Sequence, residues 1–283
     1  MKKIAVNKRL LKSLLIMGAV VEARDAYTGG HLWRVSQFAK LLASKMGLDF
    51  NSIILITVGG YLHDLGKVGV PDEILRKPSS LSNEEYDVVK THPVIGHELI
   101  SEHPLSDLAQ DPIRHHHEKI DGKGYPDGLD GDTISLHSRI ISIADAFDAM
   151  TSSRPYRQGL TIEEALSRLN QERDSQFDGG LVNHFIEIGK NDELKHVVRH
   201  SDEKIPILNC PNCGPVIAVS RDVCDGDIAY CRVCTSEVKL HKSGDFFEVE
   251  GTGSFGNAEQ IKPVADMGPI DAFIKQVPAE LYI

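Results

Sequence analysis

The stretch that decides the fold is His63-Asp64-Leu65-Gly66-Lys67, read together with His116-His117-Glu118 about fifty residues later. An adjacent His-Asp pair offers an imidazole and a carboxylate from neighbouring backbone positions, and both are common ligands of divalent metals. The carboxylate of such a pair can also reach a second metal. These two motifs therefore indicate a metal centre, and the apolar run before the first motif places it among packed segments.

The chain has thirteen histidines, and nine of them lie between residues 31 and 137. A single histidine is usually a structural or exposed residue, but several here have a distinctive setting. His31 follows a Thr-Gly-Gly turn, and His92 precedes Pro93. Asp145 lies within an apolar helical segment, where a carboxylate is costly to bury without a partner or a metal. The combination favours a multinuclear metal site over a set of coincidences.

A glycine-rich run, Asp121-Gly122-Lys123-Gly124-Tyr125-Pro126, follows the second motif. With this run the sequence resembles the HD-GYP family, a branch of the HD-domain metal-dependent phosphohydrolases, over roughly residues 20–190. The resemblance implies an all-helical bundle and a ligand set. One metal is then held by His31, His63, Asp64 and Asp145, and the second by His92, His116 and His117, with Asp64 bridging.

The resemblance implies two catalytic divalent metals. Imidazole and carboxylate ligands suit Fe or Mn, and they leave Zn, Ni and Co open. Some family members carry a glutamate four residues before the first metal histidine, where it ligates a third metal. Tyr27 stands there in this chain, and its hydroxyl, with a pKa of about 10, is a poor ligand at neutral pH. Two metals are therefore expected, with Glu22 as a less favoured substitute for the third ligand.

The family hydrolyses cyclic dinucleotides, usually cyclic di-GMP to linear pGpG and sometimes on to GMP. The resemblance assigns catalytic roles to Asp64 and Lys67 and substrate contacts to Lys67, Tyr125, Arg154 and Arg157. Arginine suits phosphate because its planar fork binds two oxygens at once. The alternatives are a surface lysine for Lys67 and a helix C-terminal cap for the arginine pair.

Two other functions remain open at this point. One is a module without turnover that senses the nucleotide or docks a diguanylate cyclase. The other is a hydrolase of mixed cyclic GMP-AMP. Every expected ligand position is filled, which favours an enzyme, because modules that have lost activity usually lack several ligands.

Two cysteine pairs, Cys210/Cys213 and Cys231/Cys234, are separated by seventeen residues. Four thiolates with this CxxC spacing are typical of a closed structural zinc site. A redox pair is the alternative, and Cys224 is left over. The region looks like a zinc ribbon. We expect it to stabilise the chain or to contact a protein partner such as a diguanylate cyclase.

The patterns predict a mainly α protein in three parts: a helical catalytic domain over residues 1–200, a small β-rich zinc ribbon over 205–250, and a tail of unknown role over 251–283. Ser82 with Glu85, and Thr161 with Glu164, have the capping-box spacing that opens a helix.

The formal net charge is −10, without a strongly basic stretch, which argues against a broad nucleic-acid or membrane-surface face. The start of the chain, Met1-Lys2-Lys3 followed by Leu10 to Val21, resembles a signal peptide. Its uninterrupted apolar part, Leu14 to Val21, is too short to span a bilayer, which takes about 20 residues. An amphipathic first helix is favoured instead. We therefore expect a cytoplasmic protein without a membrane anchor, and a homodimer is left open.

Overall fold

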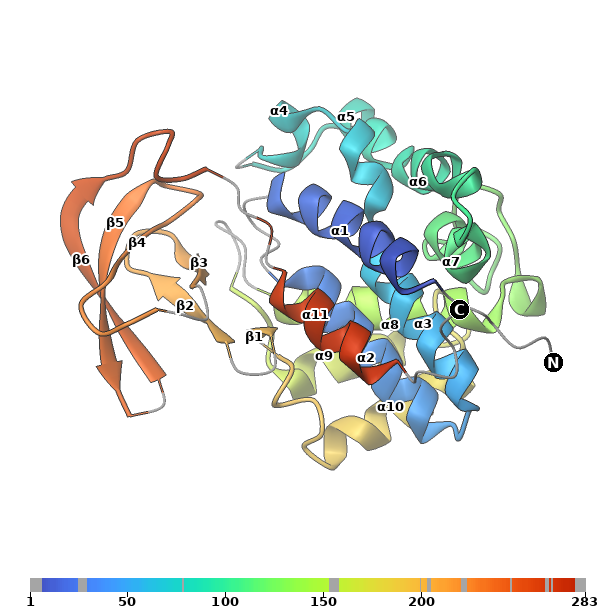
Figure 1. Cartoon of the computed structure of the whole chain (residues 1–283). Helices are drawn as coiled ribbons and strands as arrows, with labels where there is room; N and C mark the ends of the chain where they lie inside the picture. The colour runs from blue at the N-terminus through green and yellow to red at the C-terminus, as the bar shows by residue number, and fades with distance from the viewer. Residues whose placement is uncertain are drawn as a thin grey trace.

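The computed structural model describes residues 7–24, 30–77, 79–152, 158–198, 200–202, 205–219, 223–244, 246–262, 265 and 267–277. A helical domain carries a smaller β domain at one end (Figure 1). The mainly α fold with a small C-terminal β module, predicted from the sequence, is confirmed.

The helical domain contains eleven α-helices and three short 3₁₀ helices among the described residues. The helices are α1 (Lys8–Arg24), α2 (His31–Lys45), α3 (Phe50–Leu62), η1 (Leu65–Gly69), α4 (Asp72–Leu75), α5 (Asn83–Val89), α6 (His92–Ser101), η2 (Ser106–Leu108), α7 (Gln110–His115), η3 (Gly131–Thr133), α8 (Leu136–Thr151), α9 (Ile162–Gln171), α10 (Gly179–Lys190) and α11 (Gly268–Gln276).

The helix starts follow the local sequence. The Ser82 and Thr161 side chains each accept the backbone N–H three residues later, so both predicted capping boxes form, at α5 and α9.

Phe38 of α2, Phe147 of α8 and Phe185 of α10 meet edge to face in the centre of the bundle. All three are fully buried, and burying such a ring contributes about 1.5–3 kcal/mol. This core fixes α2 against α8, two of the helices that carry predicted metal ligands.

The β domain consists of two three-stranded antiparallel sheets. Their strand orders are β1-β2-β3 and β4-β5-β6. The strands are β1 (His200–Asp202), β2 (Ile205–Cys210), β3 (Gly214–Ala218), β4 (Ile228–Tyr230), β5 (Ser236–Ser243) and β6 (Phe246–Phe255). Leu208, Ile217, Val238 and Leu240 form a small core of their own next to the cysteines. Strand β6 therefore extends the ribbon beyond residue 250.

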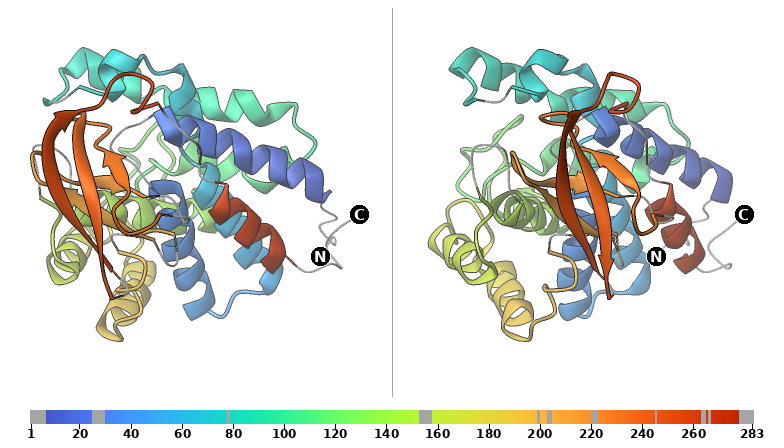
Figure 2. Two further views of the ribbon diagram at one scale, coloured as in Figure 1. Left: turned by 60° about the vertical axis from the view of Figure 1, so that its left-hand side comes forward. Right: turned by 90° about the vertical axis from the view of Figure 1, so that its left-hand side faces the viewer.

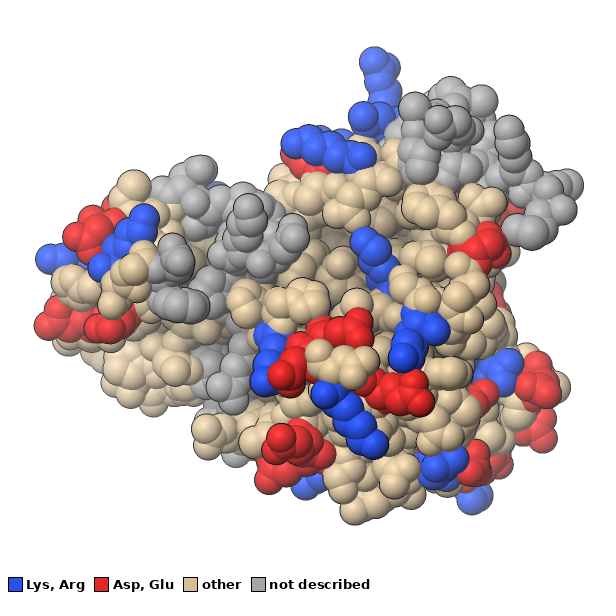
Figure 3. Space-filling view, turned by 90° about the horizontal axis from the view of Figure 1, so that it is seen from below, with Lys and Arg blue, Asp and Glu red and all other residues tan. Residues whose placement is uncertain are grey.

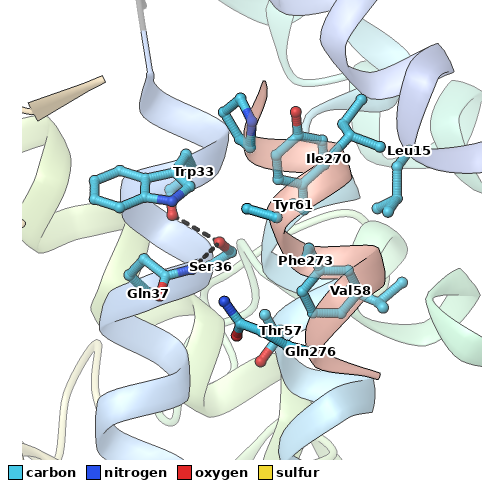
Figure 4. A pocket seen from close by; sticks show the side chains of 12 residues that line it. Leu15, Trp33, Ser36, Gln37, Thr57, Val58, Tyr61, Ile270, Phe273 and Gln276 are labelled. Carbon is cyan, nitrogen blue, oxygen red and sulfur yellow. Dashed lines mark hydrogen bonds between the residues drawn. The ribbon is translucent and has the colours of Figure 1, made fainter. Parts of the chain in front are cut away.

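Helix α11 belongs to the core of the helical domain. It buries Ile270 and Ile274 against α1, α2 and α3, and Lys12 of α1 pairs with Asp271 at 2.6 Å. Figure 4 shows the place where α11 packs on these helices. Phe273 faces a pocket there that is lined also by Trp33 and Tyr61. The predicted tail over residues 251–283 thus includes a core helix. The chain leaves the helical domain after α10 and returns to it with α11, while the exact domain limits stay a prediction.

Acidic and basic side chains are interspersed on the face seen in Figure 3. On that face the described residues form no broad basic patch. Among the described residues, no helix combines the length and the apolar character needed to cross a membrane. The cytoplasmic location expected from the sequence stays a prediction.

Candidate metal centre

Five separate chain segments converge on one buried point of the helical domain. His31 is the first residue of α2 and His92 the first of α6, His63 and Asp64 directly follow α3, His116 and His117 directly follow α7, and Asp145 lies within α8. Six of these seven ligand positions fall at a helix start or just beyond a helix end.

His31, His63 and Asp64 form one ligand group. The His31 and His63 Nε2 atoms lie 3.2 Å apart. Oδ2 of Asp64 lies 3.3 Å from His31 Nε2 and 3.4 Å from His63 Nε2. Asp145 completes the group, because its Oδ1 is 3.4 Å from His31 Nε2. The donor set predicted for the first metal is therefore gathered in one place.

The second group contains His92, His116 and His117. The His92 and His116 Nε2 atoms lie 3.2 Å apart, and the His116 and His117 ring centroids are 4.1 Å apart. The other oxygen of Asp64, Oδ1, faces this group at 3.4 Å from His92 Nε2. One carboxylate thus faces both groups with different oxygens, which is the arrangement that a bridging ligand requires.

The outer nitrogens of four imidazoles are already engaged. Nδ1 of His63 donates to the Gly60 carbonyl at 2.8 Å, and Nδ1 of His92 donates to the Val89 carbonyl at 2.8 Å. Nδ1 of His116 lies 3.0 Å from two carbonyls of α7, and Nδ1 of His31 meets the Asp148 carboxylate at 2.7 Å. Such partners fix the tautomer and leave Nε2 as the ligand atom.

This tautomer provides a test of whether the residues fit metals. Because carbonyls only accept hydrogen bonds, Nδ1 carries the proton in neutral His63, His92 and His116, and Nε2 carries a lone pair. In the neutral rings, two Nε2 lone pairs would face each other at 3.2 Å in each group. A shared cation removes that repulsion, so the donor geometry fits one divalent ion in each group.

The electrostatics of the two groups differ. Burial alone would lower the pKa of His63, but the Asp64 and Asp145 carboxylates outweigh it and raise that pKa to about 10. Burial, together with neighbouring imidazoles, lowers the pKa of His117 to about 3 and that of His116 well below its usual value. The first group therefore attracts positive charge, and the second is kept neutral, as a metal-binding imidazole must be.

Gly66 shows why the His-Asp motif needs a glycine. A Cβ atom at this position would stand 1.8 Å from the His92 carbonyl oxygen and 2.5 Å from the Gly96 nitrogen. The absent side chain lets η1 press directly on the first turns of α6. That contact brings Asp64 within reach of His92.

Three histidines, His115 to His117, run together in the chain, and their contacts distinguish the two that face the centre. His115 points away from the metal centre, because its ring nitrogens meet Asp111 at 2.9 Å and Asp127 at 3.0 Å. His116 and His117 are the two that face the centre, in agreement with the motif alignment. Glu22 accepts the backbone N–H of Leu32 at 2.9 Å and lies in none of the metal-ligand groups found among the described residues. Tyr27 lies outside the described residues.

Two of the predicted substrate contacts adjoin the ligands. The Lys67 ammonium lies 2.7 Å from Asp64 Oδ2. The Tyr125 ring stacks on His117, with centroids 4.8 Å apart and planes 28° apart. Arg154 and Arg157 lie outside the described residues, so their role stays a prediction.

Glu118 holds the loop that carries Tyr125, a role that its sequence motif does not reveal. It is 3% exposed, and its carboxylate accepts backbone N–H bonds from Asp127 at 2.7 Å, Gly128 at 3.1 Å and Leu129 at 3.0 Å. These bonds close the loop that carries Tyr125. The Asp127-Gly128 pair after Tyr125-Pro126 is a turn signal in the sequence, but the residue that accepts its backbone N–H groups cannot be identified from spacing.

The four ribbon cysteines also meet. Cys210 and Cys234 lie 3.5 Å apart between their sulfur atoms, and Cys213 and Cys231 lie 3.3 Å apart. The four sulfur atoms all lie within 4.8 Å of one another, whereas Cys224 is exposed and outside the group. This cluster is the tetrad predicted from the CxxC spacing.

Comparison with known proteins agrees with this geometry. A family model described as the HD domain matches residues 14–181. The chain is 39% identical over 175 residues to the cyclic di-GMP phosphodiesterase response regulator RpfG of Xanthomonas campestris, covering 61% of this chain and 46% of that protein.

Two further relatives are similar over the same region. One is a cyclic di-GMP phosphodiesterase of Thermotoga maritima, 34% identical over 69% of this chain and 53% of the relative. The other is the 3′3′-cGAMP-specific phosphodiesterase 3 of Vibrio cholerae, 38% identical over 57% of this chain and 35% of the relative. The chain thus spans about half or less of the length of these relatives.

Proposed function

The chain belongs to the HD domain family, and on that premise we propose that it is a metal-dependent phosphodiesterase that hydrolyses cyclic di-GMP to pGpG and, in a second cut, to GMP. The single observation that carries the proposal is Asp64, whose two oxygens face two separate histidine groups. Two divalent ions, of which Fe or Mn suits these ligands best, would activate water and neutralise charge on the phosphoryl oxygens.

The side chains around the ligands have distinct tasks in this proposal. Asp64 holds both groups in register, and the Lys67 ammonium beside it offers positive charge to a phosphate oxygen. Tyr125 presents a flat ring at the edge of the second group, where a nucleobase can stack. Arg154 and Arg157 are proposed to grip the second phosphate of the substrate.

The direct test is product identification with defined metal content. Protein purified without oxygen and reconstituted with Fe²⁺ or Mn²⁺ should bind two equivalents in the helical domain plus one zinc, and it should convert cyclic di-GMP to pGpG. Chromatography of the products and elemental analysis measure both. A protein with both metals that binds cyclic di-GMP without converting it would overturn the enzyme and favour a sensing or cyclase-docking module.

Mixed cyclic GMP-AMP is the second candidate substrate. It is favoured by the relative from Vibrio cholerae, which is named as specific for 3′3′-cGAMP. Parallel kcat/KM measurements with both dinucleotides decide between the two substrates. A preference for the mixed dinucleotide would change the substrate but leave the proposed reaction intact.

Glu118→Gln should weaken substrate binding about tenfold and leave the two metals in place. The glutamine keeps the shape but loses the charge that three backbone N–H groups share, and hydrogen bonds to a charged group are worth about 1.5–3 kcal/mol. The loop would then hold Tyr125 less firmly against His117. The measurement is the dissociation constant for cyclic di-GMP with metal analysis, and Glu98→Gln on the exposed side of α6 is the control. An unchanged dissociation constant would remove the loop from substrate binding.

For the ribbon we propose one structural zinc held by Cys210, Cys213, Cys231 and Cys234. The inward convergence of four sulfur atoms supports this, since thiolates at contact distance need a cation to balance their charge. A protein partner at the ribbon, such as a diguanylate cyclase, remains part of the proposal.

A further inference from the structure

Arg34 occupies a central place between the metal centre and the ribbon. It is 2% exposed, and its guanidinium grips the Asp148 carboxylate with Nε at 2.5 Å and Nη2 at 3.0 Å. Asp148 in turn accepts from His31 Nδ1 at 2.7 Å. Arg34 thereby sets the position of the carboxylate that orients the first metal ligand.

The third nitrogen of the Arg34 guanidinium, Nη1, contacts the β domain. It donates to the backbone carbonyl of His200 at 2.9 Å. His200 begins β1, and β1 pairs with β2, which ends at the zinc-ligand position Cys210. The same buried guanidinium therefore contacts both the orienting carboxylate of the metal centre and the sheet that carries the first cysteine pair.

An electrostatic interaction places the other cysteine pair near the same helix turn. Arg232 lies between Cys231 and Cys234. It is half-buried, and its positive charge lies near the Glu22 carboxylate. Glu22 also accepts the backbone N–H of Leu32 at 2.9 Å. In Figures 1 and 2 the β domain lies beside the end of α1 that carries this glutamate. Both cysteine pairs are thus connected to the first turn of α2, which presents His31.

We propose that Arg34 is a positioning residue that makes the orientation of His31 depend on the zinc-bound fold of the ribbon, so that loss of ribbon zinc weakens metal binding at the His31 group. Without zinc, the end of β2 at Cys210 is no longer fixed. Strand β1, which pairs with β2, then no longer positions the His200 carbonyl next to Arg34. A guanidinium that loses one of its contacts holds Asp148 less firmly. The inference rests on the proposed metal centre.

Manganese binding tests the inference independently of turnover. Mn²⁺ prefers oxygen and nitrogen ligands to thiolates, so it reports on the helical domain even when the cysteines are empty. Free Mn²⁺ is counted by its electron paramagnetic resonance signal in full-length protein. Arg34→Lys, which keeps the charge but cannot reach Asp148 and His200 together, should weaken binding of one Mn²⁺ by about 10- to 100-fold.

Cys210→Ser should weaken the same Mn²⁺ by about 2- to 30-fold, the range of couplings between linked sites. In an Arg34→Lys background Cys210→Ser should cost much less, because the connection through Arg34 is already cut. Cys224→Ser and Arg139→Lys are the matched controls. The first removes a cysteine outside the tetrad, and the second alters an arginine that bridges two carboxylates without touching a metal ligand. Both should bind Mn²⁺ like the unaltered chain.

Three results would overturn the coupling: normal Mn²⁺ affinity in Arg34→Lys, normal affinity in Cys210→Ser, or an equal loss from Cys210→Ser in both backgrounds. If Cys210→Ser does not fold, a mercurial reagent that expels zinc from the unaltered protein replaces it, and Mn²⁺ release should follow zinc release. A chain that binds no Mn²⁺ at all would refute the proposed function. Mn²⁺ binding that is unchanged in Arg34→Lys and in Cys210→Ser would refute only the coupling.

Discussion

Replacing Asp64 by asparagine should lower hydrolysis of a cyclic dinucleotide by about a thousandfold. Oδ2 of this residue lies 3.3 Å from His31 Nε2, and Oδ1 lies 3.4 Å from His92 Nε2. The amide keeps the shape but presents an NH₂ group to one side, so one group of ligands loses its shared oxygen. Charge stabilisation by metals is worth several kcal/mol, and each 1.36 kcal/mol changes the rate tenfold.

The chain offers a matched control for this substitution. Asp87 pairs with Lys90 three residues later at 2.6 Å, just as Asp64 pairs with Lys67 at 2.7 Å, but Asp87 lies on the outer surface of α5. Asp87→Asn should keep full turnover and both metals. Turnover and elemental analysis of the two variants give the comparison. More than a few per cent of activity in Asp64→Asn would show that the two histidine groups do not depend on a shared carboxylate.

The residues that gather at the centre could be named from the sequence, because metal chemistry limits the residue types and the resemblance to the HD-GYP family supplies the set. His63-Asp64 and His116-His117 are adjacent in the chain, and a helix end places neighbouring side chains at one point regardless of the rest of the fold. Asp145 stood out as a carboxylate in an apolar helix. The cysteine pairs followed the same logic, since the CxxC spacing closes half of a tetrahedral site locally.

The contacts that organise the centre could not be predicted in this way. Arg34 meets Asp148 and His200 across more than a hundred residues, and nothing in its own neighbourhood marks it as buried. Glu118 is held by backbone groups, which leave no trace in residue type. Helix α11 is nine residues long, and it is identified as core only once its partners α1, α2 and α3 are in place. These features are products of tertiary packing, which local patterns do not encode.

Lys67→Met should lower the single-turnover rate by about 10²- to 10³-fold while changing the dissociation constant for the dinucleotide much less. The methionine keeps the length of the side chain and removes its charge. Lys67 is partly buried and lies on the Asp64 oxygen that faces His31 and His63, so a phosphate held at the metal centre would meet its ammonium. Removing one preorganised donor at the position where charge develops typically costs this factor in rate, and only interactions that strengthen in the transition state lower the barrier.

The Asp87–Lys90 pair again provides the control, since Lys90→Met removes an ammonium from the same kind of pair at the surface of α5. It should leave rate and affinity unchanged. Metal analysis of Lys67→Met separates two roles for Lys67. If its ammonium serves only to hold Asp64, the metal content should fall together with the rate. If it acts on the phosphate, the metals stay and the rate alone falls. A normal rate with normal metals would assign Lys67 to the protein surface, and the developing charge would then have to be met by the metals and by the arginines after α8.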